Sequence, residues 1–296
     1  MGIPNDSEEP ADVSDITVIL NLYRRPEYLA AQIAGIRAQI FPPREIWLWV
    51  NDHEANRSLT GLDTLGLDRI FRNDFNWKYA GRFAAGLLAR TEYIAFFDDD
   101  TIPGPRWFAN CLSTMKESEG ILGTAGIRFT SRDYDQECGV HGWSRPSNHT
   151  VAVDFVGHAW FLRRDWLKAF WREDLATWDT AEDMHLSFAA QKHLGLETFC
   201  PPHPANDLSL HGSTRGRELG ADGRSGGETL GANAFYKERE RAFLEYVRRG
   251  WKLRGRRSFW RIEVRNRLSS MAWVRSAYEQ VKGILPDWFR RAFFLR

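Results

Sequence analysis

The sequence has few cysteines and no long apolar run. Three cysteines occur in 296 residues, at positions 111, 138 and 200, without the close spacing of metal-binding cysteines. Their odd number argues against a disulfide framework and favours a reducing compartment. No apolar run reaches the roughly 18 residues that a membrane-spanning helix needs. We therefore expect a cytoplasmic protein without a transmembrane helix.

The sequence also has little net charge, because two opposite imbalances cancel. The net charge is +1, yet the segment from Trp251 to Arg296 has twelve Lys and Arg against three Asp and Glu. That segment carries +9, so residues 1–250 carry −8. Residues 1–14 are acidic, contain proline and do not resemble a signal peptide. We expect three parts: a disordered segment over 1–14, a folded domain over 15–250 and a basic tail over 251–296.

Apolar residues in the tail recur at steps of three and four, which predicts one face of an amphipathic helix. They are Trp260, Val264, Leu268, Met271, Val274, Tyr278, Val281, Leu285 and Trp288. Two interpretations stay open. The face packs on the rest of the protein, or it lies on an anionic membrane as a peripheral anchor. The apolar stripe among the basic residues makes nucleic acid the less favoured partner.

Strand-like and helix-like segments alternate in the first hundred residues. Expected strands cover 16–22, 45–52, 69–71 and 93–97, and expected helices cover 24–41 and 77–90. This alternation predicts an α/β fold with parallel strands and helices on both faces of the sheet. Ligands bind beyond the carboxyl ends of such strands, where Asn21, Asn51, Asp52 and the run 98–100 all fall.

Three adjacent aspartates, Asp98, Asp99 and Asp100, follow the short apolar strand at 93–97. Ionised carboxylates repel one another and are costly beside a buried strand unless something neutralises them. A hard divalent cation such as Mg²⁺ or Mn²⁺ takes oxygen ligands of this kind. The alternative is a solvated acidic turn, because a bare Asp-x-Asp is common.

The alternation is less regular after residue 103. Residues 120–129 and 152–167 are expected to form strands, and the second of these runs into a helix. Residues 177–195 are expected to contain a capped helix. Thr180 is placed as its N-cap, with Asp183 three residues on in the position of a capping-box acid. The helix is expected to stop near Gly195.

The order of these motifs resembles the GT-A glycosyltransferases: a nucleotide-sugar half, an Asp-x-Asp strand end and then an acidic helix. The exostosin-like transferases are the closest resemblance and the family 2 glycosyltransferases are next, over about residues 16–250. The resemblance implies a GT-A, Rossmann-like, mostly parallel sheet flanked by helices. It also implies metal-dependent transfer of a sugar from a nucleotide-sugar donor, most often a UDP-sugar. The acceptor would be a glycan, which a lipid can carry, in the synthesis of a surface polysaccharide or glycoconjugate.

The resemblance also assigns residues. Donor contacts fall on Arg25, Asn51, Asp52, Asn76, Arg82, Asp98, Asp99 and Arg128, with Asn76 one position off the family spacing. Metal ligation falls on Asp98 and Asp100, with His211 as a third ligand. A late basic residue that closes on the diphosphate has several candidates, which are Arg215, Arg217, Arg224 and Lys237.

The acidic pair Glu182 and Asp183 matches the catalytic acids of these families. Family 2 enzymes use this Asp as a general base that deprotonates the acceptor hydroxyl, with inversion at the anomeric carbon. Exostosin-like enzymes retain the configuration, so the stereochemical outcome stays open. The structural alternative is that carboxylates are simply favoured at the start of a helix.

Three other functions compete with sugar transfer to a glycan. A nucleotidyltransferase usually carries a Gly-rich loop after its first strand, and "NLYRRPEYL" has no glycine. A catalytically inactive glycan-binding or scaffold protein is disfavoured by the intact Asp98, Asp100 and Asp183. A DNA-modifying glycosyltransferase is conceivable because a basic segment can bind phosphates.

Overall fold

The computed structural model describes residues 14–129, 134, 138–219 and 232–254. The expected disordered segment, apart from Ser14 at the start of the first strand, lies outside these residues. The tail beyond residue 254, with its predicted amphipathic helix, also lies outside them. Among the described helices, none is both long and apolar enough to cross a membrane.

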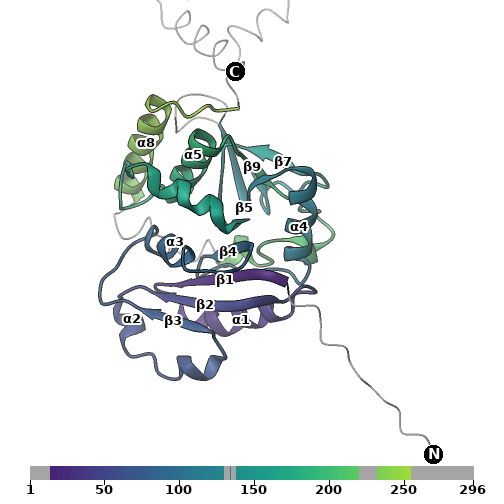
Figure 1. The fold of residues 1–296 in the computed structure, drawn as a ribbon, viewed down its shortest axis with the longest axis vertical. Coiled ribbons are helices and arrows are strands. Elements are labelled where there is room, and N and C mark those ends of the chain that lie inside the picture. Colours follow the sequence, from purple (N-terminus) through teal and green to yellow (C-terminus); the bar gives the residue numbers. More distant parts are fainter. Residues whose placement is uncertain (1–13, 130–133, 135–137, 220–231, 255–296) are drawn as a thin grey trace, which may run out of the picture.

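Nine described strands form one sheet (Figure 1). They are β1 (Ser14–Leu22), β2 (Pro43–Val50), β3 (Arg69–Arg72), β4 (Tyr93–Phe97), β5 (Gly120–Phe129), β6 (Cys138–Gly142), β7 (Val151–Val153), β8 (Phe155–Arg163) and β9 (Glu197–Cys200). The strand order is β3-β2-β1-β4-β8-β5-β9-β7, with β6 paired to β5. The longer helices are α1 (Leu29–Arg37), α4 (Trp107–Glu117), α5 (Glu182–Leu194) and α8 (Ala232–Arg248). The shorter ones are α2 (Glu54–Arg57), α3 (Gly81–Gly86) and α6 (Gly216–Leu219), with 3₁₀ turns η1 (Pro26–Tyr28), η2 (Leu62–Leu65), η3 (Arg164–Arg172) and η4 (Leu208–Leu210).

The first half of the sheet is parallel and buried on both faces. β1 lies between β2 and β4 and pairs in parallel with both. Successive side chains of a strand point to opposite faces. Val18 and Leu20 accordingly pack in the cluster with α1 and α4, while Ile19 packs in the opposite cluster with Phe83 of α3. This arrangement confirms the predicted α/β fold with helices on both faces.

The second half of the sheet is mainly antiparallel, and this half positions the site. β8 runs antiparallel to both β4 and β5, with Ala159 opposite Phe97. The register brings the residue before Ala159, His158, beside the residue after Phe97, Asp98. A hydrogen bond of 3.0 Å from the Asp98 N–H to the His158 carbonyl fixes this pairing.

Two helices begin or end away from their predicted limits. The helix expected over 77–90 is reduced to α3, Gly81–Gly86, because side chains hold the preceding segment as a loop. The side-chain oxygens of Asn51 and Asn76 accept the backbone N–H groups of Trp77 and Lys78. The helix expected from residue 24 starts as the 3₁₀ turn η1, with Pro26 in its first turn as predicted.

The C-terminal part of the described chain closes over the antiparallel half of the sheet. α8 lies beside α5, both at the upper end of the view in Figure 1. A third apolar cluster joins Phe129 and Phe155 of the sheet to Tyr246 of α8. Trp251 and Leu253 are buried in the same cluster, so this packing continues past the predicted domain limit at residue 250.

Candidate functional site in a pocket at the end of strand β4

The three aspartates form the turn that follows strand β4, and their carboxylates have different partners. Asp98 points to the α3 side of the sheet, where its Oδ1 accepts a hydrogen bond from Nη1 of Arg82. Asp99 points the other way and forms an ion pair with Nη1 of Arg25 at 2.9 Å. Asp98 and Asp99 therefore pair with different arginines. The like charges that look costly in the sequence are separated in space and partly neutralised.

Asp99 organises the loop after strand β1. Its Oδ2 accepts the backbone N–H groups of Tyr23, at 3.3 Å, and Arg24, at 3.1 Å. Nη1 of Arg25 also lies 3.5 Å from Oδ2 of Asp100. One buried arginine thus joins the loop at residues 23–25 to the strand end that carries the acids.

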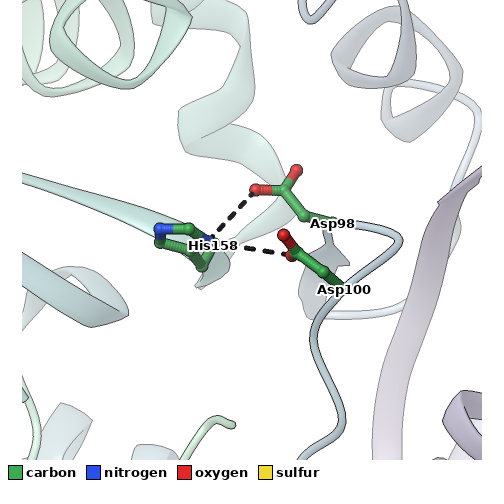
Figure 2. A group of neighbouring side chains, drawn as sticks. All are labelled: Asp98, Asp100 and His158. Atoms are coloured by element: carbon green, nitrogen blue, oxygen red, sulfur yellow. Dashed lines mark ion pairs between the residues drawn. The ribbon is translucent and has the colours of Figure 1, made fainter. Parts of the chain in front are cut away.

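Asp98, Asp100 and His158 form the one group of three His, Cys, Asp or Glu ligand atoms within 4.8 Å of one another in the described chain. Figure 2 shows the His158 ring turned toward both carboxylates, with Nδ1 at 3.9 Å from Asp98 Oδ2 and 3.8 Å from Asp100 Oδ1. Nδ1 is buried and makes no hydrogen bond. Ligands about 2.1 Å from one metal ion are about 3 to 4 Å apart, so this donor set fits a divalent cation.

The electrostatics of this group suit a bound cation. Burial opposes the charged form of Asp100, but the neighbouring His158 and Arg25 outweigh it and lower the Asp100 pKa. Burial raises the pKa of Asp98, against the opposing effect of Arg82. Burial also disfavours the His158 imidazolium, yet Asp100 and Asp98 outweigh it and raise the His158 pKa. Two carboxylates in a largely buried place therefore attract either a proton on His158 or a metal ion.

The backbone is strained at two points of the site. His158 has φ = 66° and Ala181 has φ = 67°, the left-handed region that side chains other than glycine rarely adopt. The structure has only one other described non-glycine residue in this region, Lys78. Such strain persists where the surrounding structure fixes it, and it gathers at functional sites.

Helix α5 starts with the acidic pair. Its N-cap is Ala181, so the prediction of Thr180 as the N-cap is wrong. The Thr180 hydroxyl instead accepts a hydrogen bond from Nη1 of Arg239 at 3.2 Å, and the helix start has no side-chain cap. The C-cap is Gly195 with φ = 68°, which confirms the predicted end of the helix.

Each acid of the pair has its own arginine. Glu182 Oε1 accepts from Nη2 of Arg82 at 3.3 Å, and Asp183 Oδ2 pairs with Nη2 of Arg239 at 2.8 Å. Asp183 Oδ1 accepts the Met184 N–H at 2.7 Å. Burial, followed by the charge of Asp183, raises the pKa of Glu182 to about 8.

The acids, the loop and the imidazole line one cavity of about 510 Å³. Asn21, Tyr23 and Arg25 come from the parallel half of the sheet, and Asp183 and Arg239 come from the opposite side. Gly157 also lines the cavity, and a Cβ there would make only an ordinary contact of 3.8 Å with Asp183 Oδ2. The possible metal group and Asp183 therefore line the same cavity.

A family model named glycosyl transferase family 2 matches residues 17–171. The chain belongs to glycosyl transferase family 2. Its fold is the GT-A α/β fold of glycosyltransferases, as predicted. The match includes the three aspartates and His158 and ends before the acidic pair. The finer resemblance to the exostosin-like transferases stays a prediction.

Among solved structures, the glycosyltransferase chain is similar to the crystal structure of TarS 1–349 from S. aureus. The TM-score is 0.46 and the identity 17%, with 64% of this chain and 58% of that chain covered. No curated protein matches the chain.

Six of the predicted site residues of this glycosyltransferase line the cavity. They are Arg25, Asp98, Asp99, Asp100, Glu182 and Asp183. Arg82 has no exposed surface and is not among the residues that line the cavity. Its guanidinium contacts the carboxyl groups of Asp98 and Glu182.

The other predicted donor contacts are engaged elsewhere. The Asn51 amide hydrogen-bonds to Asn21, Trp49 and backbone groups near residue 78. Asp52 accepts two hydrogen bonds from Arg57 at 2.7 and 2.6 Å, which lower its pKa. Asn51, Asp52 and Asn76 are not among the residues that line the cavity.

His211 and Arg128 are also not brought into the cavity. His211 is buried, with Nε2 at 2.8 Å from the Pro204 carbonyl and its ring 4.8 Å from the His203 ring. The possible metal group contains His158, and His211 is not part of it.

The sequence reasoning missed His158 and Arg239 as site residues. A lone histidine in an apolar strand gives no signal of its own, and the sequence favours a structural role for His158. Its signal is the antiparallel register with β4, which a sequence does not show. Arg239 lies two positions from Lys237, one of the predicted late basic candidates, and it reaches Asp183 from α8.

Proposed function

We propose that this glycosyltransferase moves a sugar from a nucleotide-sugar donor, a UDP-sugar first among the candidates, to an acceptor hydroxyl in a metal-dependent reaction. One observation carries the proposal: Asp98, Asp100 and His158 face the same cavity as Asp183. The group suits a diphosphate-bound cation, and the acid suits an acceptor hydroxyl. A donor held by its diphosphate and an acceptor hydroxyl held at Asp183 can therefore meet in one cavity.

The residues that would hold the cation are Asp100, Asp98 and His158, with Mn²⁺ or Mg²⁺ as the proposed ion. When bound, the ion stabilises the negative charge of the leaving diphosphate. The protein supplies the rest of the donor contacts. Arg25, tied to Asp99 and Asp100, sets the loop at residues 23–25 against the donor side of the cavity.

Asp183 is proposed as the general base of an inverting transfer, the role of this acid in family 2. The acceptor oxygen attacks the anomeric carbon, and the bond from that carbon to the phosphate oxygen breaks with its electron pair on the diphosphate. The proton of the acceptor hydroxyl passes to Asp183. Arg239 and the Met184 N–H hold the Asp183 carboxylate in one orientation for this step. Glu182 is proposed to support Asp183 by holding the start of helix α5 through its contact with Arg82.

The acceptor is proposed to be a glycan, free or carried on a lipid, in the synthesis of a surface polysaccharide or glycoconjugate. A cytoplasmic location with peripheral membrane contact through residues 251–296 belongs to the same proposal. A function without catalysis is less well supported, because the acids stay paired, oriented and open to the cavity.

The test is a panel of nucleotide sugars, with release of the nucleotide measured in Mn²⁺, in Mg²⁺ and in EDTA. We expect one donor to be turned over only with a divalent cation. Asp100→Asn should lower that rate by about 10²-fold or more, the scale of losing a main stabiliser of transition-state charge. Asp63→Asn, an exposed acid outside the site, serves as the matched control. Undiminished turnover in EDTA would contradict the proposal.

A further inference from the structure

Arg82 joins the two halves of the site. It comes from the short helix α3 and has no exposed surface. Its Nη1 donates to Asp98, sixteen residues later, and its Nη2 donates to Glu182, one hundred residues later. One guanidinium therefore connects the end of strand β4 to the start of helix α5.

Two aromatic rings pack against the Arg82 guanidinium and restrict its movement. Its Cζ lies 4.7 Å from the centre of the Trp160 ring and 5.4 Å from that of Phe83. Its Nε is buried without a hydrogen bond. A planar guanidinium presents its N–H donors in a rigid fork. Its position is therefore set by the two rings and by the carboxyl groups of Asp98 and Glu182. Neither carboxylate can move without changing the contact of the other.

Asp98 is shared between Arg82 and the proposed metal group. Its Oδ1 accepts from Arg82, while its Oδ2 faces His158 at 3.9 Å. A cation at Asp98 Oδ2 draws negative charge away from Arg82. The guanidinium then interacts more strongly with Glu182, which is next to Asp183 on α5.

We propose that Arg82 is a positioning residue that couples metal binding at Asp98 to the placement of the α5 start, where Asp183 lies. This inference rests on the proposed function, because it takes Asp98 as a metal ligand. Binding of the metal with the donor at Asp98 thereby fixes the position of Asp183 on the other side of the cavity. Arg82 itself touches neither the cation nor the sugar.

A double-mutant cycle on Mn²⁺ affinity, measured by calorimetry on the full chain at pH 7, tests the coupling. Glu182→Leu removes one of the two acceptors of Arg82, so that the guanidinium pairs with Asp98 alone. Arg82 then competes more strongly with the metal ion for the Asp98 carboxylate. We expect the Mn²⁺ Kd to rise by about 3-fold or more, within the range of coupled neighbours. In an Arg82→Lys background, where the ammonium reaches one carboxylate, the same change should alter Kd by less than about 1.5-fold.

The matched control is Arg239→Lys, which alters the arginine that pairs with Asp183. The changes that Arg239→Lys and Glu182→Leu make in the free energy of Mn²⁺ binding should add. If Glu182→Leu raises Kd equally in the wild type and in the Arg82→Lys background, the inference is overturned, because a plain charge effect does not need Arg82. If the wild type binds no Mn²⁺ at all, the proposed function fails together with the inference.

A second measurement needs no variant and keeps the inference testable if Arg82→Lys does not fold. Amide hydrogen exchange in the first turn of α5 is compared with and without Mn²⁺. Coupling through Arg82 predicts slower exchange at residues 183–186 when Mn²⁺ is bound. The end of α5 at residues 192–194 serves as the internal control. Unchanged exchange in the first turn, with Mn²⁺ bound, would overturn the inference.

Discussion

Single residues of the site show how a sequence of like charges becomes a stable structure. Asp98 and Asp99 follow strand β4 and pair with different buried arginines. The need for neutralising partners is readable in the sequence. The identity of those partners is not, because Arg82 and Arg25 reach the acids from segments 16 and 74 residues away.

His185 shows how burial makes a residue sensitive to pH. Its ring lies between the Tyr246 hydroxyl and the Phe170 carbonyl, and burial lowers its pKa from 6.5 to about 4. The folded state therefore keeps His185 neutral while the unfolded state binds a proton. We predict that the free energy of unfolding falls as pH falls from 6.5 to 4, by at most about 3 kcal/mol from this residue.

The measurement is urea unfolding of the wild type and of His185→Gln at several pH values between 4 and 7. The glutamine side chain can keep one hydrogen bond without titrating. The difference in unfolding free energy between the two proteins should shift in favour of the variant as pH falls. His203, whose pKa is also lowered to about 4 by burial, is present in both and cancels. Parallel curves would show that His185 does not titrate on unfolding.

Helix α5 is the element whose start the sequence described least well. The acidic pair and the end at Gly195 were predicted, while the N-cap was not. A capping-box pattern assumes that the side chain of Thr180 is free to turn to the helix. Arg239, from the last described helix, takes that hydroxyl instead. The contact joins residues 59 apart in the chain, so local pattern could not reveal it.

The start of α5 gives a prediction about catalysis. Asp183→Asn should abolish sugar transfer and leave nucleotide-diphosphate binding close to the wild-type value, because the donor-side residues are unchanged. The loss should reach about 10²-fold or more, the contribution of a positioned general base. Calorimetry with the nucleotide and Mn²⁺ separates the two roles. Transfer at a near wild-type rate would mean that Asp183 only stabilises the helix start.

The whole molecule divides into a parallel half that the sequence predicts well and an antiparallel half that it does not. Strand β1 and strand β4 follow clear apolar runs with turn signals between them. The pairing of β8 with β4 joins residues more than 60 positions apart, such as Phe97 and Ala159, and no local pattern fixes that register. The proposed metal ligand His158 depends on this pairing, which explains why it was missed.

Trp251 and Leu253, just past the predicted domain limit at residue 250, pack in the third apolar cluster, and their contribution can be measured. Trp251 is 5% and Leu253 7% exposed. A chain ending at Gly250 lacks both side chains and should lose about 3 kcal/mol or more of unfolding free energy, the scale of emptying such buried sites. A chain ending at Arg254 keeps these contacts. Thermal and urea unfolding of the two chains checks the prediction, and equal stabilities would contradict it.

Membrane contact through the basic tail stays a prediction of the sequence. The full chain should co-sediment with anionic vesicles at low salt, with binding that weakens as salt is added. The chain ending at Arg254 should remain in the supernatant, with its folded body intact. Recovery of both chains in the supernatant at low salt would leave the tail without a role at such membranes.

The account depends most on the metal group of Asp98, Asp100 and His158. The most direct measurement is the Mn²⁺ affinity of His158→Leu beside that of His149→Leu, an exposed histidine outside the cavity. Loss of a ligand should weaken Mn²⁺ binding by at least about 10-fold, as even outer partners of metal sites can. The His149 variant should bind like the wild type. Equal Mn²⁺ affinity in the His158 variant and the wild type would contradict the assignment of this group as the metal site.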